Sequence, residues 1–563
     1  MSVTQPKRRT MNYVLGAILI VIIVAGLGYY FATQSQTATT TSMMTSSSAG
    51  AGVKDTLIIG TTDSVATTLD PANAYDLFGA TIIQNLGAPL YDLRPGGTDF
   101  VPALATNYTV SSDGLTWTFN LRQGVMFSDG TPFNATAVKY TFDRGIALND
   151  PTGPFVGVGY GTIINRTEVT GPYQVVFHLN VPFAPFLALM PFSASYIVNP
   201  KYAPFSSEVN YTAGDPRHST PMDLGPYVLS EWNRVGGKDV EMRLDANPNY
   251  WNASGGYPRT PHIVIKFYSD STTLALAVEN GEVDLAYRQL RPTDIISMES
   301  NPSLKVWKGA GSFIQYLVMQ ESIKPFDNAL IRRAIAASIN RTSIVSTVFQ
   351  GQAQPLYSIV PIGMMSHQDV FKLYGDANYT YTRTVLAELG YNSTNPLVID
   401  LWYDQSGHYP SEADIATVLK SSLEASGVIQ VNLQGTDWAT LDGSNLPAGN
   451  MPMWIFGWYP DYDDPNDYTY NFFQTQGSSW LNDHYSNPAA DMVIGQALAS
   501  RNTTERIQLY GQAQQILAAD VPLIPLFQST AYAVSNPNVG GVVIDFPQIL
   551  RYWLLYENVT STT

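Results

Sequence analysis

Hydrophobic positions alternate in several short segments of the chain, which predicts β-strands there. LIIG predicts a short buried strand, and LTWTFNL places Trp117, Phe119 and Leu121 on one face. The turn residues Gln123–Gly124, followed by VMF, predict that this strand continues into a hairpin that stops at Asp129–Gly130. GPYVLSEW, PHIVIKFYSD and LVIDLWYD predict further strands.

Helical spacing of apolar residues dominates later in the chain. NALIRRAIAASIN and TTERIQLYGQAQQILAAD each place an apolar stripe on one helix face, which we interpret as core. The members of the two stripes are Leu330, Ile331, Ala334, Ile335 and Ile339, then Ile507, Tyr510, Ala513 and Leu517. SEADIATVLKSSLEASG predicts another helix, with Ser411 as its N-cap, Asp414 closing a capping box and Gly427 at its C-terminal end.

Composition restricts the class of protein. A chain of 563 residues exceeds one compact domain and suggests about three. It is 45% hydrophobic and 13% charged, which describes a folded, loop-rich α/β protein. The net charge is −16 and no Lys/Arg cluster follows residue 9, so we exclude nucleic acid as a partner. Without cysteine there is no disulfide, thiolate metal site or lipid-modified anchor.

The N-terminus predicts attachment to a membrane. Residues 1–10 are basic, and within the predicted anchor 11–32 the uncharged stretch from Met11 to Phe31 would be about 31 Å long as a helix, enough to cross a bilayer with the N-terminus inside. A cleaved signal peptide is the alternative. Residues 33–52 are rich in Ser and Thr and predict a flexible or glycosylated stalk, which would hold the body outside the cell.

Asn-x-Ser/Thr sequons recur throughout the body and favour a glycosylated exterior. They lie at Asn107, Asn134, Asn165, Asn210, Asn252, Asn340, Asn378, Asn392, Asn502 and Asn558. Together with the missing lipid cysteine, the stalk and the low charge, they suggest an archaeal protein from an acidic habitat.

The stretch GWYPDYDDPND crowds acids and aromatic residues after an apolar run. A Ca²⁺ loop would need alternating oxygen ligands, a central Gly and a distal Glu, which this spacing lacks. We interpret Asp463, Asp464 and Asp467 as a solvated Asp-Pro turn. For Asp461, a ligand anchor and the same solvated turn both remain open.

Several segments, in order over roughly residues 55–535, resemble the extracytoplasmic solute-binding proteins of ABC importers, family 5, which includes oligopeptide- and dipeptide-binding proteins. The segments are LATNYTVSSDGLTWTFNLRQGVMFSDGTPFNATAVKYTFDR, LGPYVLSEW, NPNYWN, ENGEVDLA, PFDNALIRRAIAASINR, VLAELGY and GWYPDYDDP. The resemblance implies a type II periplasmic-binding-protein fold, in which two α/β lobes joined by a hinge close on a ligand and an extra domain is inserted. Its boundaries here would be 53–90, 185–270 and 521–558 for lobe I, 91–184 for the extra domain and 271–520 for lobe II.

The same resemblance implies the ligand-binding residues. Asp461 matches the acid that receives the α-ammonium group of a peptide, and a buried carboxylate suits that role because an unpaired one is costly. Trp458 and Trp438 match pocket tryptophans, although both could equally be core residues. Relatives carry arginines before the Gly-Trp pair, where this chain has Ile455 and Phe456.

The carboxylate end of a peptide needs a cation, and His408 is the candidate because it precedes the predicted helix at Ser411. The alternative is an ordinary exposed loop histidine. In an acidic medium a protonated His408 would favour tighter peptide binding below about pH 6 than at pH 8.

No catalytic pattern is present, since the six histidines are isolated and no nucleophile elbow or phosphate loop occurs. We predict no enzymatic activity and no cofactor. The predicted function is capture of short peptides by lobe closure and delivery to the permease subunits of an ABC transporter. An oligosaccharide receptor of the same family and a structural surface-layer or adhesive protein remain alternatives.

Overall fold

The N-terminal segments predicted as cytoplasmic (1–10), membrane-spanning (11–32) and stalk (33–52) lie outside the part of the chain that is described. Among the described residues, no helix is both long and apolar enough to cross a bilayer. The computed structural model describes residues 53–288, 290–406, 408–409 and 411–559.

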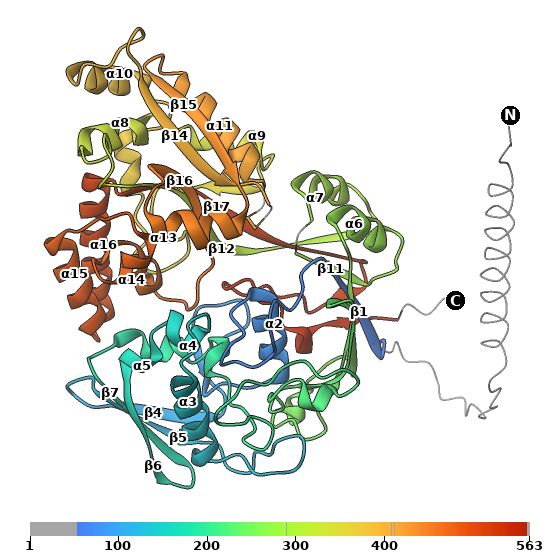
Figure 1. Ribbon diagram of the computed structural model, residues 1–563. Coiled ribbons are helices and arrows are strands. Elements are labelled where there is room, and N and C mark those ends of the chain that lie inside the picture. The colour runs from blue at the N-terminus through green and yellow to red at the C-terminus, as the bar shows by residue number, and fades with distance from the viewer. Residues whose placement is uncertain (1–52, 289, 407, 410, 560–563) are drawn as a thin grey trace, which may run out of the picture. The chain divides into compact units, whose positions relative to one another are not determined.

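One large mixed sheet runs through the body (Figure 1). In the described residues its strand order is β15-β14-β16-β12-β17-β11-β1-β10-β9-β8, with β13 paired to β17 beside this path. The long strands β12 and β17 pair along most of their length and join the β14–β16 end to the β11–β1–β10 end. The bounds are β1 Thr56–Thr61, β8 Tyr227–Val235, β9 Lys238–Ala246, β10 His262–Phe267, β11 Leu285–Tyr287, β12 Lys305–Met319, β13 Ala353–Pro355, β14 Leu397–Asp404, β15 Ile429–Thr436, β16 Met453–Trp458 and β17 Leu523–Ser535.

A second sheet carries the TWTFNL segment. Its order in the described residues is β4-β5-β7-β6, and β5 pairs with β4 and β7. The predicted hairpin is therefore wrong: Val125 and Phe127 are buried, but Met126 forms only an isolated bridge to Pro132 before the turn at Gly130. The small strands and this sheet are β2 Tyr91–Leu93, β3 Phe100–Pro102, β4 Ala105–Val110, β5 Thr116–Leu121, β6 Ile164–Gly171, β7 Gln174–Leu179, β18 Val539–Gly540 and β19 Tyr556–Glu557.

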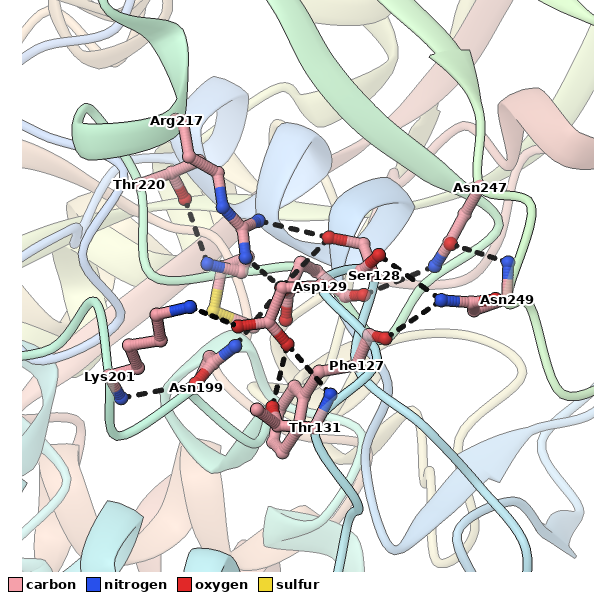
Figure 2. Close-up of polar contacts among 12 residues, drawn as sticks. Phe127, Ser128, Asp129, Thr131, Asn199, Lys201, Arg217, Thr220, Asn247 and Asn249 are labelled. Carbon is pink, nitrogen blue, oxygen red and sulfur yellow. Dashed lines mark hydrogen bonds and ion pairs between the residues drawn. The ribbon is translucent and has the colours of Figure 1, made fainter.

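A polar joint ties the loop after β5 to the segments that precede β8 and follow β9 (Figure 2). Asp223 is fully buried, and its carboxylate accepts hydrogen bonds from Ser128 at 3.0 Å and from Arg217. Asn249 donates to the carbonyl groups of Phe127 and Ser128, both at 3.1 Å. These bonds fix the second sheet's loop to the large sheet.

Helices cover the sheets, and the predicted helical segments are confirmed as α8, α11 and α16. Most stripe residues are buried, whereas Leu330 and Ile507 are exposed at the stripe edges. The predicted cap of α11 is wrong, because Ser411 adopts a left-handed backbone (φ 60°) and its side chain makes no capping bond. The helices are α2 Leu77–Leu86, α3 Ala135–Leu148, α4 Pro154–Gly157, α5 Tyr160–Ile163, α6 Ser271–Glu279, α7 Pro292–Glu299, α8 Ala329–Ser338, α9 Arg341–Thr347, α10 Tyr379–Glu388, α11 Glu412–Glu424, α12 Trp438–Thr440, α13 Leu446–Ala448, α14 Pro465–Phe473, α15 Pro488–Ala499 and α16 Thr503–Asp520.

Several sequons have a structural explanation that does not involve glycans. Asn134, Asn340, Asn378 and Asn502 are the N-caps of α3, α9, α10 and α16, and their side chains accept hydrogen bonds from backbone N–H groups of the first turn. Asn is a favoured N-cap because it satisfies these otherwise unpaired donors. The sequon count is therefore weaker support for a glycoprotein than it was from sequence, and glycosylation stays a prediction.

Candidate ligand-binding site

The segment GWYPDYDDP connects the end of β16 to the start of α14. The first five residues of β16 are buried, and Pro465 lies in the first turn of α14. Asp464 caps that helix by accepting from the N–H of Asn466 at 2.9 Å, and Arg506 donates to both of its carboxylate oxygens at 2.7 and 2.8 Å. The loop between the two elements is therefore held at both ends.

Two carboxyls of this loop lie close together. The Asp467 carboxylate accepts from the indole N–H of Trp458 and from the backbone N–H of Asp461, both at 3.1 Å. The Tyr75 hydroxyl, which comes from the segment before α2, donates to the Asp461 carboxylate at 2.8 Å. Burial raises the pKa of Asp461 to about 7, and burial together with the Asp461 charge raises the pKa of Asp467.

The prediction of a solvated turn is wrong for Asp464 and Asp467. Asp464 and Asp467 are 4% and 0% exposed, and Asp463 is half-buried. The partner of Asp464 is Arg506 on α16 and that of Asp467 is the Trp458 side chain, and the local sequence does not reveal either contact. The two fully buried acids thus support the loop, and Asp461 is the one that faces open space.

Asp461 lines a cavity of about 560 Å³. One wall comes from early segments of the chain and includes Asp63, Tyr75 and Asp76. Later segments contribute Trp458 and His408 to the lining, so the structure brings three of the four predicted residues, Asp461, Trp458 and His408, together. A concave site with mixed polar and aromatic walls is typical of small-ligand binding.

Trp438 is not among the residues that line this cavity. It lies behind His408, and the two rings stack at 3.7 Å between centroids with an interplanar angle of 6°. Trp438 also packs against the aromatic rings of Tyr409 and Phe456. Trp438 therefore packs behind residues of the site and does not line the cavity. This corresponds to the alternative of a core residue that the sequence left open.

The environment of His408 does not suit the predicted role of a protonated carboxylate partner. Burial lowers the pKa of His408, although Asp404 nearby acts in the opposite direction. Its backbone N–H donates to Asp404 at 2.8 Å, and its ring is covered by Trp438. A neutral imidazole in this position can donate or accept one hydrogen bond but supplies no positive charge at neutral pH.

The cation that the sequence did not identify is Arg288. It follows β11 in a left-handed backbone conformation (φ 68°), lies 2.7 Å from Asp63 through its Nε atom, and covers the ring of Tyr459. Burial alone would lower the pKa of Arg288, but the charge of Asp63 raises it, so the guanidinium stays charged. Its Nη1 atom is buried and has no hydrogen-bond partner among the described residues.

Nothing in the described part of the chain points to metal chemistry, since no group of three or more His, Asp or Glu side chains there could hold a metal ion. The cavity instead combines the carboxylates of Asp63, Asp76 and Asp461 with an aromatic lining and the guanidinium of Arg288. The fold and this site define a class: an α/β binding protein that encloses a small polar ligand between segments from distant parts of the chain.

The chain belongs to family 5 of the bacterial extracellular solute-binding proteins, whose model matches residues 99–480. The family predicted from the sequence is confirmed, and the body lies outside the cytoplasm. Di/tripeptide-binding protein 2 of Pseudomonas aeruginosa is 30% identical over 479 residues, which cover 80% of this chain and 86% of that protein. Glutathione-binding protein GsiB of Escherichia coli K12 is 27% identical, with 84% of this chain and 89% of that protein covered.

Solved structures agree on the fold. The periplasmic binding protein DppA from Helicobacter pylori, in complex with the peptide STSA, superposes with a TM-score of 0.74 at 25% identity and covers 90% of this chain and 98% of its own. The predicted type II periplasmic-binding-protein fold is thereby confirmed. The archaeal source stays a prediction.

Proposed function

We propose that the protein is the binding component of an ABC importer and that it captures short peptides with a free N-terminus. The observation that carries this proposal is the Asp461 carboxylate, which is half-buried in the wall of the cavity with the Tyr75 hydroxyl as its side-chain partner. A peptide α-ammonium group would form a charge-assisted hydrogen bond with it. The relative named for di- and tripeptides, and the structural neighbour solved in complex with a peptide, support this ligand class.

Capture works by closure of two lobes. We assign 53–90, 185–270 and 521–558 to lobe I, 91–184 to the extra domain and 271–520 to lobe II. Tyr75 then belongs to lobe I and Asp461 to lobe II, so a ligand between them contacts both lobes only in the closed state. Its differential affinity for that state shifts the conformational equilibrium.

The steps of import that follow peptide capture are carried out by other proteins. The permease subunits of the transporter receive the peptide, and segment 11–32 holds the body at the membrane. The chain itself performs no reaction in this proposal. Solute binding followed by release is its whole activity.

A thermal-shift panel tests the proposal. The purified chain is melted with a pool of free-amine di- and tripeptides, with the same pool N-acetylated, and with a panel of oligosaccharides. We expect a rise in melting temperature with the free-amine pool alone, because a ligand that binds only the folded state stabilises it. A rise with sugars alone would replace the peptide proposal by the oligosaccharide receptor, with Trp458 as a stacking surface.

The pH dependence of binding follows from Asp461. A bound ammonium favours the ionised carboxylate, so affinity is complete above the unbound pKa of about 7 and is lost as the pH falls below it. We expect binding at pH 5.5 to be on the order of tenfold weaker than at pH 7.5, measured by calorimetry. This is the reverse of the trend predicted from a protonated His408. Tighter binding at pH 5.5 would contradict the role of Asp461.

A further inference from the structure

A second cavity of about 340 Å³ adjoins the first, and we call it the side cavity. Its wall is strongly aromatic: Phe313 stacks on Tyr459 at 4.5 Å between ring centroids, and Phe349 lies 4.5 Å from Phe527. Its volume is within the range of small-ligand pockets, roughly 300–1,000 Å³. Neither the sequence interpretation nor the proposed amine anchor accounts for this cavity.

The two cavities meet at a shared wall. Arg288 and Tyr459 line both of them, and the guanidinium of Arg288 lies over the Tyr459 ring at 5.6 Å from its centroid. Arg288 uses its Nε atom for Asp63, whereas Nη1 has no hydrogen-bond partner in the described part of the chain. A buried donor without a partner is costly, and an anion placed on Nη1 would remove that cost.

Charge differs between the two sides of this wall. The first cavity is lined by three acids, Asp63, Asp76 and Asp461. Among the described residues that line the side cavity there is no Asp or Glu; Arg288 belongs to its wall, and so does Arg291, whose charge is paired with Asp294 at 2.8 Å. The potential therefore becomes more positive from the Asp461 end towards the side cavity, which matches the polarity of a peptide that enters with its ammonium at Asp461.

We propose that the side cavity is a second ligand compartment that receives the last residue of a bound peptide, with Arg288 holding its carboxylate and the aromatic wall holding a large apolar side chain. This inference rests on the proposed function and adds a specificity to it. The preferred ligands are short peptides with a free C-terminus and an aromatic or large aliphatic final residue. Arg288 thus binds the peptide carboxylate, the role that the sequence analysis assigned to His408.

Titration calorimetry at pH 7.5 with defined peptides tests the inference on the unmodified protein. The probes are Ala-Ala-Phe, its C-terminal amide, and Ala-Ala-Gly. We expect amidation to weaken binding at least thirtyfold, because the amide removes the charge that pairs with buried Arg288. Replacement of the final Phe by Gly should weaken binding at least tenfold, because the aromatic wall then loses its contact. Equal affinities for all three peptides would overturn the inference.

Two variants locate the effect. Arg288→Gln should bind the free acid and the amide equally, and Leu290→Trp, which fills the side cavity from its rim, should lose the preference for Phe over Gly. Arg234→Gln is the matched control, since Arg234 pairs with Asp239 through Nε at 3.0 Å outside both cavities, and it should keep the wild-type ratios. An unchanged acid-to-amide ratio in Arg288→Gln would overturn the role of Arg288; if that variant does not fold, Leu290→Trp decides.

The outcomes also separate this inference from the function on which it rests. If none of the three peptides binds, the proposed function fails. If all three bind without discrimination at the C-terminus, the peptide function stands and the second compartment is wrong.

Discussion

Asp461→Asn is expected to weaken binding of free-amine peptides by about 2–5 kcal/mol, which is a factor of roughly 30 or more in Kd. The substitution keeps the size of the side chain and an oxygen that can accept from the Tyr75 hydroxyl, so the local structure should persist. What it removes is the negative charge that an ammonium group requires. N-acetylated peptides are expected to bind weakly to the wild type for the same reason, so their affinity should not change in the variant.

Asp463→Asn is the matched control for this experiment. Asp463 is two residues away and half-buried, and it does not line the cavity of about 560 Å³, although it lines a smaller one of about 50 Å³ beside Asp461. We expect the Asp463→Asn variant to bind free-amine peptides with the wild-type Kd, measured by calorimetry. An Asp461→Asn protein that binds as tightly as the wild type would remove the amine anchor from the account.

Arg506→Met is expected to have the largest effect on stability. It would leave the Asp464 carboxylate, which is 4% exposed, without the cation that donates to both of its oxygens. Removing one partner of a buried ion pair typically costs about 3–5 kcal/mol. We expect a loss of this size in the free energy of unfolding, measured by urea denaturation and followed by tryptophan fluorescence.

The double variant Arg506→Met/Asp464→Asn separates the buried charge from lost packing. Asn is as good an N-cap as Asp, so α14 keeps its cap while the uncompensated charge disappears. Much of the lost stability should return in the double variant. If the single variant unfolds at the wild-type urea concentration, Arg506 does not hold the binding loop as described.

Local patterns were sufficient for the elements whose periodicity is strong. The apolar stripes of α8 and α16 and the strand LVIDLWYD occur as predicted. The hairpin prediction failed because both edges of β5 are already paired, one with β4 before it and the other with β7 more than fifty residues later, and the second pairing has no local signal. The predicted Ser411 cap is wrong because that residue adopts a left-handed conformation in which its side chain makes no capping bond.

The binding site was predictable only where the family resemblance reached it. Asp461, Trp458 and His408 do line one cavity. The charge state of His408 was not predictable, since it depends on burial against Trp438. Arg288 was not predicted as a site residue, because its partner Asp63 lies in another segment of the chain and because a single Arg after an apolar strand is not a distinctive sequence pattern.

The central claim is that the cavity beside Asp461 binds a short peptide by its free N-terminus, and one titration tests it most directly. The purified chain is titrated at pH 7.5 with Ala-Ala-Ala and, separately, with N-acetyl-Ala-Ala-Ala. The account predicts one site per chain with a micromolar or lower Kd for the free peptide, and binding at least thirtyfold weaker for the acetylated one. Equal binding of both peptides, or no heat from either, would contradict it.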